Sequence, residues 1–320
     1  MSTALRSSVR SILHFVPLAL GALLLSLLGG GAPVPAASTP SEERLDTLDR
    51  VRFEEAKALA VDPRGRVYVA DAGRDAIIIL SPTGETRAVL GGAGTRAGQF
   101  IDPADMDPTN GQTLYVADAG NGRLQRFSEE LQYLESLPVG RDVMDGRSRR
   151  AFDDGRDGSG TQGDGRPIAV QSSAGDHTFA IDEQAGIVVK WDAQRRPERI
   201  VGDDLQPRGR LDRPVALALE KDRRLYVADR GQEGILVYDR FGTFLHRLST
   251  PPLPDVRALT FRKGRLWIVC PDRVLVWNPN GERLTEHSLD LPAPLVDVEP
   301  VSDGLYVLTS TRLWVREAPR

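Results

Sequence analysis

The sequence has little of the chemistry that builds disulfide-rich domains and many hydrolytic enzymes. It holds one cysteine, Cys270, in 320 residues, which excludes an internal disulfide. Beyond the amino-terminal region it holds three histidines, His177, His246 and His287. It lacks a Gly-x-Ser-x-Gly elbow, a phosphate-binding loop and a Cys-x-x-Cys pair. Stability must therefore come from packing, and the sequence presents no assembled catalytic set.

An excess of basic charge is missing as well. The chain has 41 Lys and Arg residues against 45 Asp and Glu residues, a formal net charge of −4. Proteins that bind nucleic acid normally concentrate basic residues on one face. We therefore expect no nucleic-acid partner.

The apolar run at 12–28 follows Arg6 and Arg10 in a stretch that has no acidic residue. A basic start followed by such a run is typical of a secretory signal peptide. The run spans 17 residues and contains Pro17, which is short for a transmembrane helix, although an uncleaved membrane anchor is the alternative. We expect an exported protein, periplasmic or secreted, with no membrane insertion after cleavage.

The cleavage site is expected after Ala36, because Val34 and Ala36 are small residues at positions −3 and −1. This gives a signal peptide over 1–36 and a mature chain over 37–320. No cysteine follows the apolar run, which excludes lipid attachment of the bacterial lipoprotein kind. Removal of the signal takes away two positive charges and no negative one, so the net charge goes from −4 to −6.

What the sequence does have is a repeat, and a repeat decides the fold class before any single element does. Four segments have the pattern of a strand, an Asp-containing turn and a second strand: 66–80, 114–127, 178–191 and 225–239. Asp71 and Asp118 are 47 residues apart, as are Asp182 and Asp229, with 64 residues between the pairs. Two weaker copies, 266–278 and 305–317, carry Cys270 and Thr309 at the Asp position.

Each unit is preceded by a short apolar stretch, at 58–63, 104–108, 167–172, 214–220, 256–261 and 295–300. Several units are followed by a turn such as SPTGE, DRFGT or NPNGE and a further alternating stretch. The glycine of these turns supplies the positive φ that a tight hairpin needs. A unit therefore has four antiparallel strands. Six such units predict an all-β fold, a six-bladed β-propeller that forms a single domain.

The last unit ends after three strands, while residues 44–53 are left over ahead of the first unit. We expect this amino-terminal segment to supply the outer strand of the sixth blade. Such pairing closes the ring and covers an exposed strand edge.

The repeat also resembles a known family. The pattern P-x-x-L-A-V-D, G-x-V/L-Y-V-A-D-x-G and I/L-x-V/R-F/Y-D-x-x-G is present in blades one, two and four, and LGGAGTRAGQFIDP (90–103) is similar to a Gly-rich connector. These features resemble the NHL-repeat β-propellers over essentially all of 44–320, with degenerate third, fifth and sixth blades. The family and its relatives include protein-binding modules, RNA binders, sensor domains and a few metal-dependent enzymes, so the resemblance implies a fold more than a function.

The repeated aspartates, Asp71, Asp118, Asp182 and Asp229, are interpreted as structural. An Asp at the end of a strand can accept hydrogen bonds from backbone N–H groups of the turn, as in an Asx-turn. A catalytic residue is needed once, whereas this one recurs in four blades. Cys270 is interpreted in the same way, as a half-buried apolar substitute, and the four tryptophans as packing between blades.

Two other aspartates are candidates for a site. Alignment of the innermost strands gives one position per blade: Ala60, Asp105, Ala169, Ala218, Thr260 and Asp297. Small residues fit near a crowded axis, so Asp105 and Asp297 stand out, since a buried carboxylate usually pairs, binds metal or shifts its pKa. One hypothesis is an axial calcium site similar to that of gluconolactonase-type propellers. The alternative pairs these aspartates with Lys57 and Arg257.

The insertion 141–166 is rich in Asp, Gly and Arg. Asp153 and Asp157 stand at positions 1 and 5 of an EF-hand-like loop, but Gly155 occupies position 3 and no Glu occupies position 12. The segment is therefore interpreted as a surface loop that contributes to recognition, with a calcium loop as the alternative.

These observations give two hypotheses for function. The first is an exported monomeric propeller that acts as a binding or scaffold module for a protein, peptide or glycan partner and needs no cofactor. The second is a metal-dependent enzyme, lactonase-like or lyase-like, with Ca²⁺ or another metal on the axis at Asp105 and Asp297. The fold also resembles propeller lyases that place histidines around a central metal. Here His246 and His287 fall on equivalent outer strands, which argues against lyase chemistry.

Overall fold

The computed structural model describes residues 46–144 and 163–317, apart from positions 204, 222, 249–252, 254 and 303. The predicted signal peptide and most of the insertion, with Asp153 and Asp157, lie outside the described residues. Residues 43–320 belong to one compact unit. Within the described ranges, none of the helices has the length and apolar character that a membrane crossing requires.

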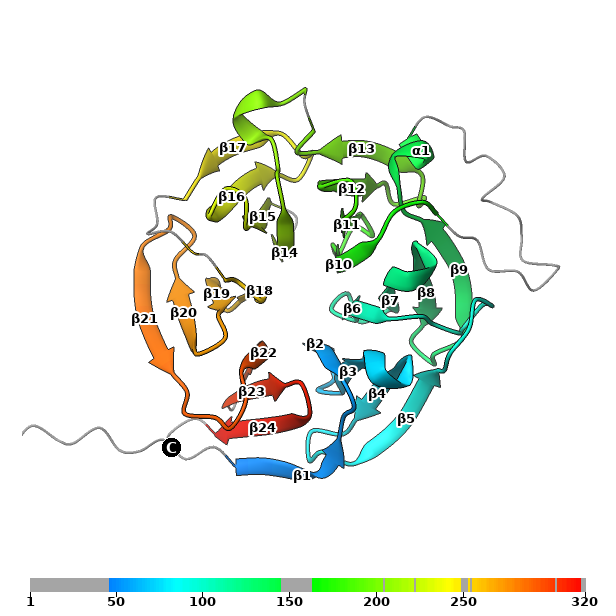
Figure 1. Ribbon diagram of the computed structural model, residues 1–320, viewed down its shortest axis with the longest axis vertical. Coiled ribbons are helices and arrows are strands. Elements are labelled where there is room, and N and C mark those ends of the chain that lie inside the picture. Colours follow the sequence, from blue (N-terminus) through cyan, green and yellow to red (C-terminus); the bar gives the residue numbers. More distant parts are fainter. Residues whose placement is uncertain are drawn as a thin grey trace, which may run out of the picture. The chain divides into compact units, whose positions relative to one another are not determined.

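The described residues form six antiparallel sheets of four strands arranged in a ring, as predicted (Figure 1). Blade one contains β2 (Ala56–Val61), β3 (Val67–Asp71), β4 (Ala76–Leu80) and β5 (Thr86–Gly91). Blade two contains β6 (Pro103–Asp107), β7 (Thr113–Asp118), β8 (Arg123–Ser128) and β9 (Tyr133–Pro138). Blade three contains β10 (Pro167–Ser172), β11 (Thr178–Asp182), β12 (Ile187–Trp191) and β13 (Pro197–Val201).

The remaining blades follow the same order from the axis outward. Blade four contains β14 (Pro214–Glu220), β15 (Arg224–Asp229), β16 (Gly234–Asp239) and β17 (Phe244–Arg247). Blade five contains β18 (Ala258–Arg262), β19 (Arg265–Val269), β20 (Arg273–Trp277) and β21 (Arg283–Ser288). Blade six contains β22 (Leu295–Val301), β23 (Gly304–Thr309), β24 (Arg312–Glu317) and β1 (Asp46–Arg52). The short helices are η1 (Ala72–Arg74), η2 (Ala119–Asn121), α1 (Arg141–Met144) and η4 (Pro207–Gly209).

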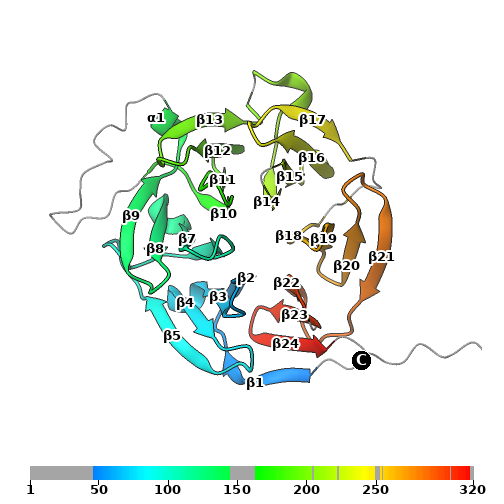
Figure 2. The ribbon, with the colours of Figure 1, turned by 180° about the vertical axis from the view of Figure 1, so that it is seen from behind.

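The ring closes through β1, as the sequence predicts. β1 pairs antiparallel with β24, with Asp46 opposite Val315 and Thr47 opposite Trp314. Figure 2 shows the ring from behind, with β1 beside β24 at its circumference. The two ends of the described chain are thus joined by backbone hydrogen bonds, and β24 is covered as an inner strand of its sheet.

The core lies between the blades rather than at the axis. Six clusters of buried apolar side chains each join two neighbouring blades. In β3 the side chains alternate: Val67 and Val69 pack toward blade six, and Tyr68 and Ala70 pack toward blade two. Because both faces of the sheet are covered, the strand is apolar from Val67 to Ala70 instead of alternating with polar residues, and all five of its residues, with Asp71 at its end, are buried.

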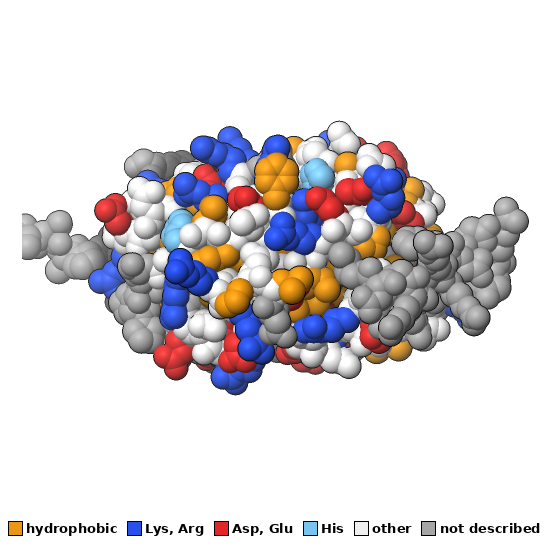
Figure 3. Space-filling model, turned by 90° about the horizontal axis from the view of Figure 1, so that it is seen from above, with side chains coloured by type: hydrophobic (Ala, Val, Ile, Leu, Met, Phe, Trp, Pro, Cys, Tyr) orange, Lys and Arg blue, Asp and Glu red, His pale blue; other side chains and the backbone are white. Residues whose placement is uncertain are grey.

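The outer strands meet solvent, and the turns that lead to three of them have the predicted chemistry. Gly84, Gly242 and Gly281, in SPTGE, DRFGT and NPNGE, have φ values of +79°, +82° and +88°. Only glycine adopts these values at little cost. On the side wall seen in Figure 3, basic and acidic side chains are interspersed among apolar ones.

Candidate functional site

The innermost strand of each blade lies at the axis of the ring (Figure 1): β2, β6, β10, β14, β18 and β22. Their side chains line a cavity of about 820 Å³. Its size lies in the range of ligand-binding cavities, 300–1,000 Å³. Its lining reaches from Lys57 and Arg257, at the start of two inner strands, to Asn110 and Lys263, in turns beyond the other end of such strands. We refer to this space as the axial channel.

The strand pairing defines two rings of equivalent positions on the innermost strands, and all of them except Ala218 line the axial channel. In each blade, one residue of the second strand comes directly before the repeated Asp position, and ring one contains its partners on the innermost strand. They are Ala58, Asp105, Ala169, Ala216, Ala258 and Asp297. Ring two lies two residues further along each strand: Ala60, Asp107, Gln171, Ala218, Thr260 and Glu299. Since side chains two residues apart share a face of a strand, the two rings lie one above the other along the axis.

The alignment made from sequence mixes these two rings. Asp105, Ala169 and Asp297 belong to ring one, but Ala60, Ala218 and Thr260 belong to ring two, so the sequence alignment was wrong by two residues in three blades. The Asp-Pro dipeptide that ends the inner stretches of blades one and two shows the difference in register. Asp107–Pro108 begins while β6 is still paired, whereas Asp62–Pro63 lies beyond the last pair of β2. Backbone hydrogen bonds, not the dipeptide, set the register.

Asp105 and Asp297 lie in equivalent places and make equivalent bonds to the next blade. Asp105 Oδ2 accepts a hydrogen bond from the Val170 N–H at 2.7 Å. Asp297 Oδ2 accepts one from the Leu59 N–H at 2.8 Å, and its Oδ1 accepts from the Val298 N–H at 2.7 Å. Each carboxylate therefore ties its own blade to a neighbour while it lines the axial channel.

Burial dominates the electrostatics of this pair. It raises the pKa of Asp105 to about 7, against the opposing effect of the Val170 N–H bond. Burial also raises the pKa of Asp297 well above its usual value, and the charge of Asp105 raises it further. Asp297 is only 6% exposed. The two acids therefore hold protons more tightly than exposed aspartates do.

The structure brings two further acids to the axial channel in ring two, and sequence reasoning missed both. Asp107 Oδ2 accepts hydrogen bonds from the N–H and hydroxyl of Ser172, at 2.5 and 2.8 Å. Glu299 accepts a hydrogen bond from Arg262 Nε at 2.6 Å; burial raises the pKa of Glu299, and Arg262 opposes this. The signal was present as Asp-x-Asp at 105–107 and Asp-x-Glu at 297–299, because residues i and i+2 of a strand share a face.

The expected alternative, pairing with Lys57 and Arg257, is wrong. Lys57 Nζ lies 2.5 Å from Asp102 and 3.5 Å from Glu55, and Arg257 lies 3.3 Å from Asp255. Asp102 also binds Arg166 at 2.5 Å. Burial raises the pKa of Asp102, but its bonds to Lys57 and Arg166 outweigh this and hold it below its usual value.

Asp105 and Asp297 consequently lack a counter-ion. In the part of the chain that the structure describes, neither aspartate forms an ion pair, whereas Glu299 has Arg262. An isolated buried carboxylate is costly unless it is neutralised, so each of these groups stays protonated or meets a cation from outside.

The residues on the axis do not fit a resident calcium or similar metal. Among the described residues, no three His, Cys, Asp or Glu side chains are grouped so that they could hold a metal ion. Calcium takes six to eight oxygen ligands, and Asp105 and Asp297 already accept backbone N–H bonds. We therefore assign no metal chemistry to this pair.

The repeated aspartates are buried outside the channel lining, and they hold the connectors that lead into each blade. Asp71 accepts hydrogen bonds from the Glu54 and Glu55 N–H groups. Asp182 and Asp229 accept equivalent bonds from residues 166 and 212–213. Asp182 and Asp229 also accept N–H groups of their turns, as predicted. Asp71 and Asp118 do not cap the turns that follow them, so in blades one and two the aspartate holds the incoming segment instead.

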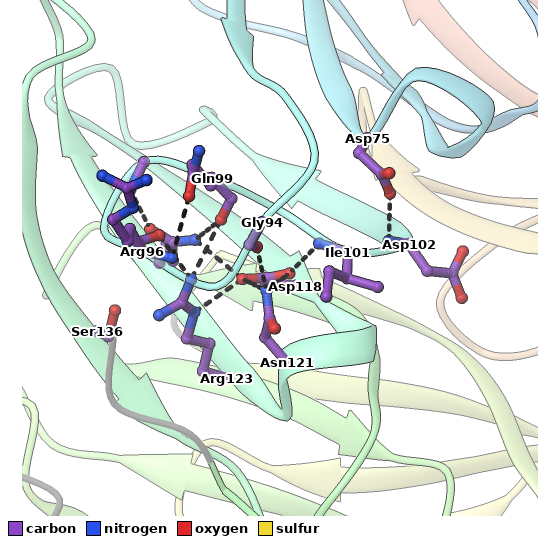
Figure 4. A network of polar contacts seen from close by, with 12 residues as sticks. Asp75, Gly94, Arg96, Gln99, Ile101, Asp102, Asp118, Asn121, Arg123 and Ser136 are labelled. Atoms are coloured by element: carbon purple, nitrogen blue, oxygen red, sulfur yellow. Dashed lines mark hydrogen bonds and ion pairs between the residues drawn. The ribbon is translucent and has the colours of Figure 1, made fainter. Parts of the chain in front are cut away.

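Asp118 has the largest such network (Figure 4). It accepts from the Ile101 N–H at 2.9 Å, from Asn121 Nδ2 at 2.9 Å, from Gln125 Nε2 at 2.9 Å and from Arg123 Nε at 2.7 Å. Arg123, which is completely buried, also donates to the Arg96 and Gln99 carbonyl oxygens. The network fastens the Gly-rich connector over blade two.

The remaining residues singled out from the sequence lie away from the axis. His246 and His287 are on the outer strands β17 and β21. Cys270 is buried, and burial raises the pKa of its thiol, which disfavours the reactive thiolate. The tryptophans pack in or against the clusters between blades.

No family model matches the sequence, and a search of curated proteins finds no match. Solved structures do match. A gluconolactonase from Xanthomonas campestris superposes with a TM-score of 0.59 at 17% identity, over 87% of this chain and 91% of its own. A streptogramin B lyase gives 0.56 at 11% identity, over 87% of each chain.

A catalytically inactive virginiamycin B lyase from Staphylococcus aureus, solved with quinupristin, gives a TM-score of 0.55 at 11% identity, over 83% of this chain and 85% of its own. At such identities the likeness shows the fold alone. The chain is thus a six-bladed β-propeller similar to those of gluconolactonases and streptogramin lyases, and membership in the NHL-repeat family stays a prediction.

Proposed function

We propose that the protein is an exported binding or scaffold module of the NHL-repeat type, and that its protein, peptide or glycan partner engages the axial channel. One observation carries this proposal. The ring of blades leaves about 820 Å³ on its axis, and the half-buried Asp105 and the buried Asp297, which face this space, have no counter-ion among the described residues. A rigid cavity with a few convergent polar groups is the usual form of a ligand site.

The site is open because ring one is built mainly from alanine. Ala58, Ala169, Ala216 and Ala258 take four of its positions, and larger side chains there would fill the axis. Three of these alanines, Ala58, Ala169 and Ala216, also belong to the clusters between blades, and Ala258 packs against one. Their small side chains therefore serve both the close packing of the blades and the open axis.

The test fills the cavity. In Ala258→Met, a flexible side chain enters the axial channel from a position that is only partly buried. Ser288→Met, on the exposed face of β21, is the matched control. Each immobilised mature chain is incubated with the native envelope fraction, and the captured material is compared. We expect the wild type and Ser288→Met to capture the same partner and Ala258→Met to lose it.

Equal capture by Ala258→Met and the wild type would contradict the proposal. A third chain that lacks 141–166 separates the insertion from the channel. Retained capture by that chain would remove the insertion from the binding surface and leave the channel as the site.

A further inference from the structure

We propose that the axial channel binds a protonated amine or guanidinium on an apolar stem, with its charge between Asp105 and Asp297 and its stem against blades four and five. This inference rests on the proposed function and adds the chemical class of the ligand. It follows from three features of the channel: its acids lie on one side, its own cations are paired with other groups, and blades four and five line it with apolar side chains.

The acids gather on one side. Asp105 and Asp107 come from β6, and Asp297 and Glu299 come from β22. These strands belong to blades two and six, which flank blade one (Figure 1). Asp105 and Asp297 both line the axial channel, and the charge of Asp105 raises the pKa of Asp297.

The cations of the protein do not neutralise this pair. Arg262 is engaged by Glu299, Lys57 by Asp102, and Arg257 by Asp255. Lys263 Nζ donates to the Val301 carbonyl oxygen at 2.6 Å. The ionisable side chains that line the channel are Lys57, Asp105, Asp107, Lys221, Arg257, Arg262, Lys263, Asp297 and Glu299. An external cation is therefore the missing partner for ring one.

Blades four and five add apolar side chains to the middle of the channel. Val215, Ala216 and Leu217 line it from blade four, and Ala258 and Leu259 line it from blade five. The basic residues of these blades, Lys221, Arg257, Arg262 and Lys263, lie at the ends of β14 and β18 or just beyond them. A hydrated metal ion or a small inorganic cation gains nothing from contact with these apolar side chains. A ligand with a charged end and a hydrocarbon stem suits both the acids and the apolar side chains, because burial of its methylene groups is favourable.

Two sources share this chemistry, a free small amine and a lysine or arginine side chain of a protein partner. The probes are therefore hexylamine and an acetylated, amidated alanine-rich peptide with one lysine. Hexan-1-ol, which has the same stem without the charge, is the control ligand. Binding is measured by isothermal titration calorimetry on the mature chain at about pH 6 and about pH 8, in two buffers of different ionisation enthalpy.

We expect hexylamine to bind and hexan-1-ol to bind at least about tenfold more weakly, since hydrogen bonds to charged groups are the stronger ones. Binding should release protons, because the cation favours the ionised aspartates. Below the pKa of about 7 of Asp105, affinity should therefore rise with pH by up to about tenfold per pH unit for each aspartate that must lose its proton.

Asp105→Asn and Asp297→Asn keep the shape and an acceptor oxygen, and each should weaken hexylamine by about 10- to 100-fold. Asp62→Asn is the matched control, because Asp62 is buried just beyond an inner strand but lies outside the channel and is paired with Arg66. Circular dichroism and melting of every variant show that it is folded. A folded Asp105→Asn that still released protons and bound hexylamine as the wild type does would overturn the proposal.

The two probes separate the sources. Tight binding of the peptide indicates a basic side chain of a partner, and binding of hexylamine without the peptide indicates a free amine. Binding of neither, or equal binding of hexan-1-ol, would overturn the inference. If that happened while Ala258→Met still lost its captured partner, the channel would remain the site and only the chemical class would be wrong.

Discussion

At the scale of the residue, Asp105 and Asp297 carry two roles at once. Each accepts a backbone N–H of the neighbouring blade, and each presents a buried acid without a counter-ion to the channel. The hydrogen bonds stabilise the ring, while desolvation destabilises the ionised form. The site is thus held at a cost in stability that an external cation would offset.

Asp105→Asn should remove a pH-dependent loss of stability. The pKa of Asp105 is about 7 in the fold, against ~3.9 in an unfolded chain, so between these values the folded protein retains a proton that the unfolded chain has released. The free energy of unfolding of the wild type should therefore fall, relative to the variant, from about pH 4 to about pH 7. The full difference, reached above pH 7, is at most about 4 kcal/mol.

Urea unfolding of both proteins at several pH values measures this difference. A gap between wild type and variant that stayed constant over that range would show that Asp105 titrates as an ordinary aspartate. Acids that do not interact with Asp105 cancel from the comparison, whereas the pKa of Asp297 should fall in the variant because the charge of Asp105 is gone.

Asp118→Ala should be among the most destabilising single substitutions. It leaves Arg123, which is completely buried, without its carboxylate, and breaking a buried pair in this way costs about 3–5 kcal/mol. Asp272→Ala is the control, because Asp272 is 71% exposed beside Arg273 and should change stability by no more than about 1 kcal/mol. Equal melting temperatures for the two variants would refute a structural role of the Asp118 network.

At the scale of the element, β1 is the piece that makes the ring a closed one. It adds the outer strand to blade six, and its neighbour in the sheet, β24, would otherwise present an open edge. Val51 also packs against the cluster that joins blades one and six. β1, which is far from β24 in the sequence, therefore completes both the sheet of blade six and the packing between blades one and six.

A chain that begins at residue 54 should melt at a lower temperature than the mature chain and should associate as its concentration rises, because β24 is then free to pair with a second copy. Differential scanning calorimetry and sedimentation velocity measure the two effects. A synthetic peptide of residues 44–53 added in trans should restore part of the stability. An unchanged melting temperature without β1 would contradict its role as a closing strand.

The sequence was sufficient for the repeat, the six blades and the closing strand, because alternating apolar segments and Gly turns are local signals. It was not sufficient for the site. The rings on the axis depend on register between strands, and the Asp-Pro dipeptide occupies different registers in blades one and two. The partners of Lys57 and Arg262 come from other blades, so residue spacing along the chain could not identify them.

At the scale of the whole molecule, the same inner strands serve packing and the channel. The six apolar clusters between blades hold the ring, and some of their alanines, with a few polar groups, also line the axis. The side wall carries both charges interspersed (Figure 3), so the polarity of the channel is a local property and not that of the surface as a whole. We therefore place recognition on the axis.

The most direct test of this claim is a crystal structure of the mature protein with 6-bromohexylamine, in which anomalous scattering locates the bromine. The account predicts one bromine peak inside the axial channel, against Ala216 and Leu217, with the amine between Asp105 and Asp297. Bromine peaks confined to the outer wall of the ring, with an empty axis, would contradict it.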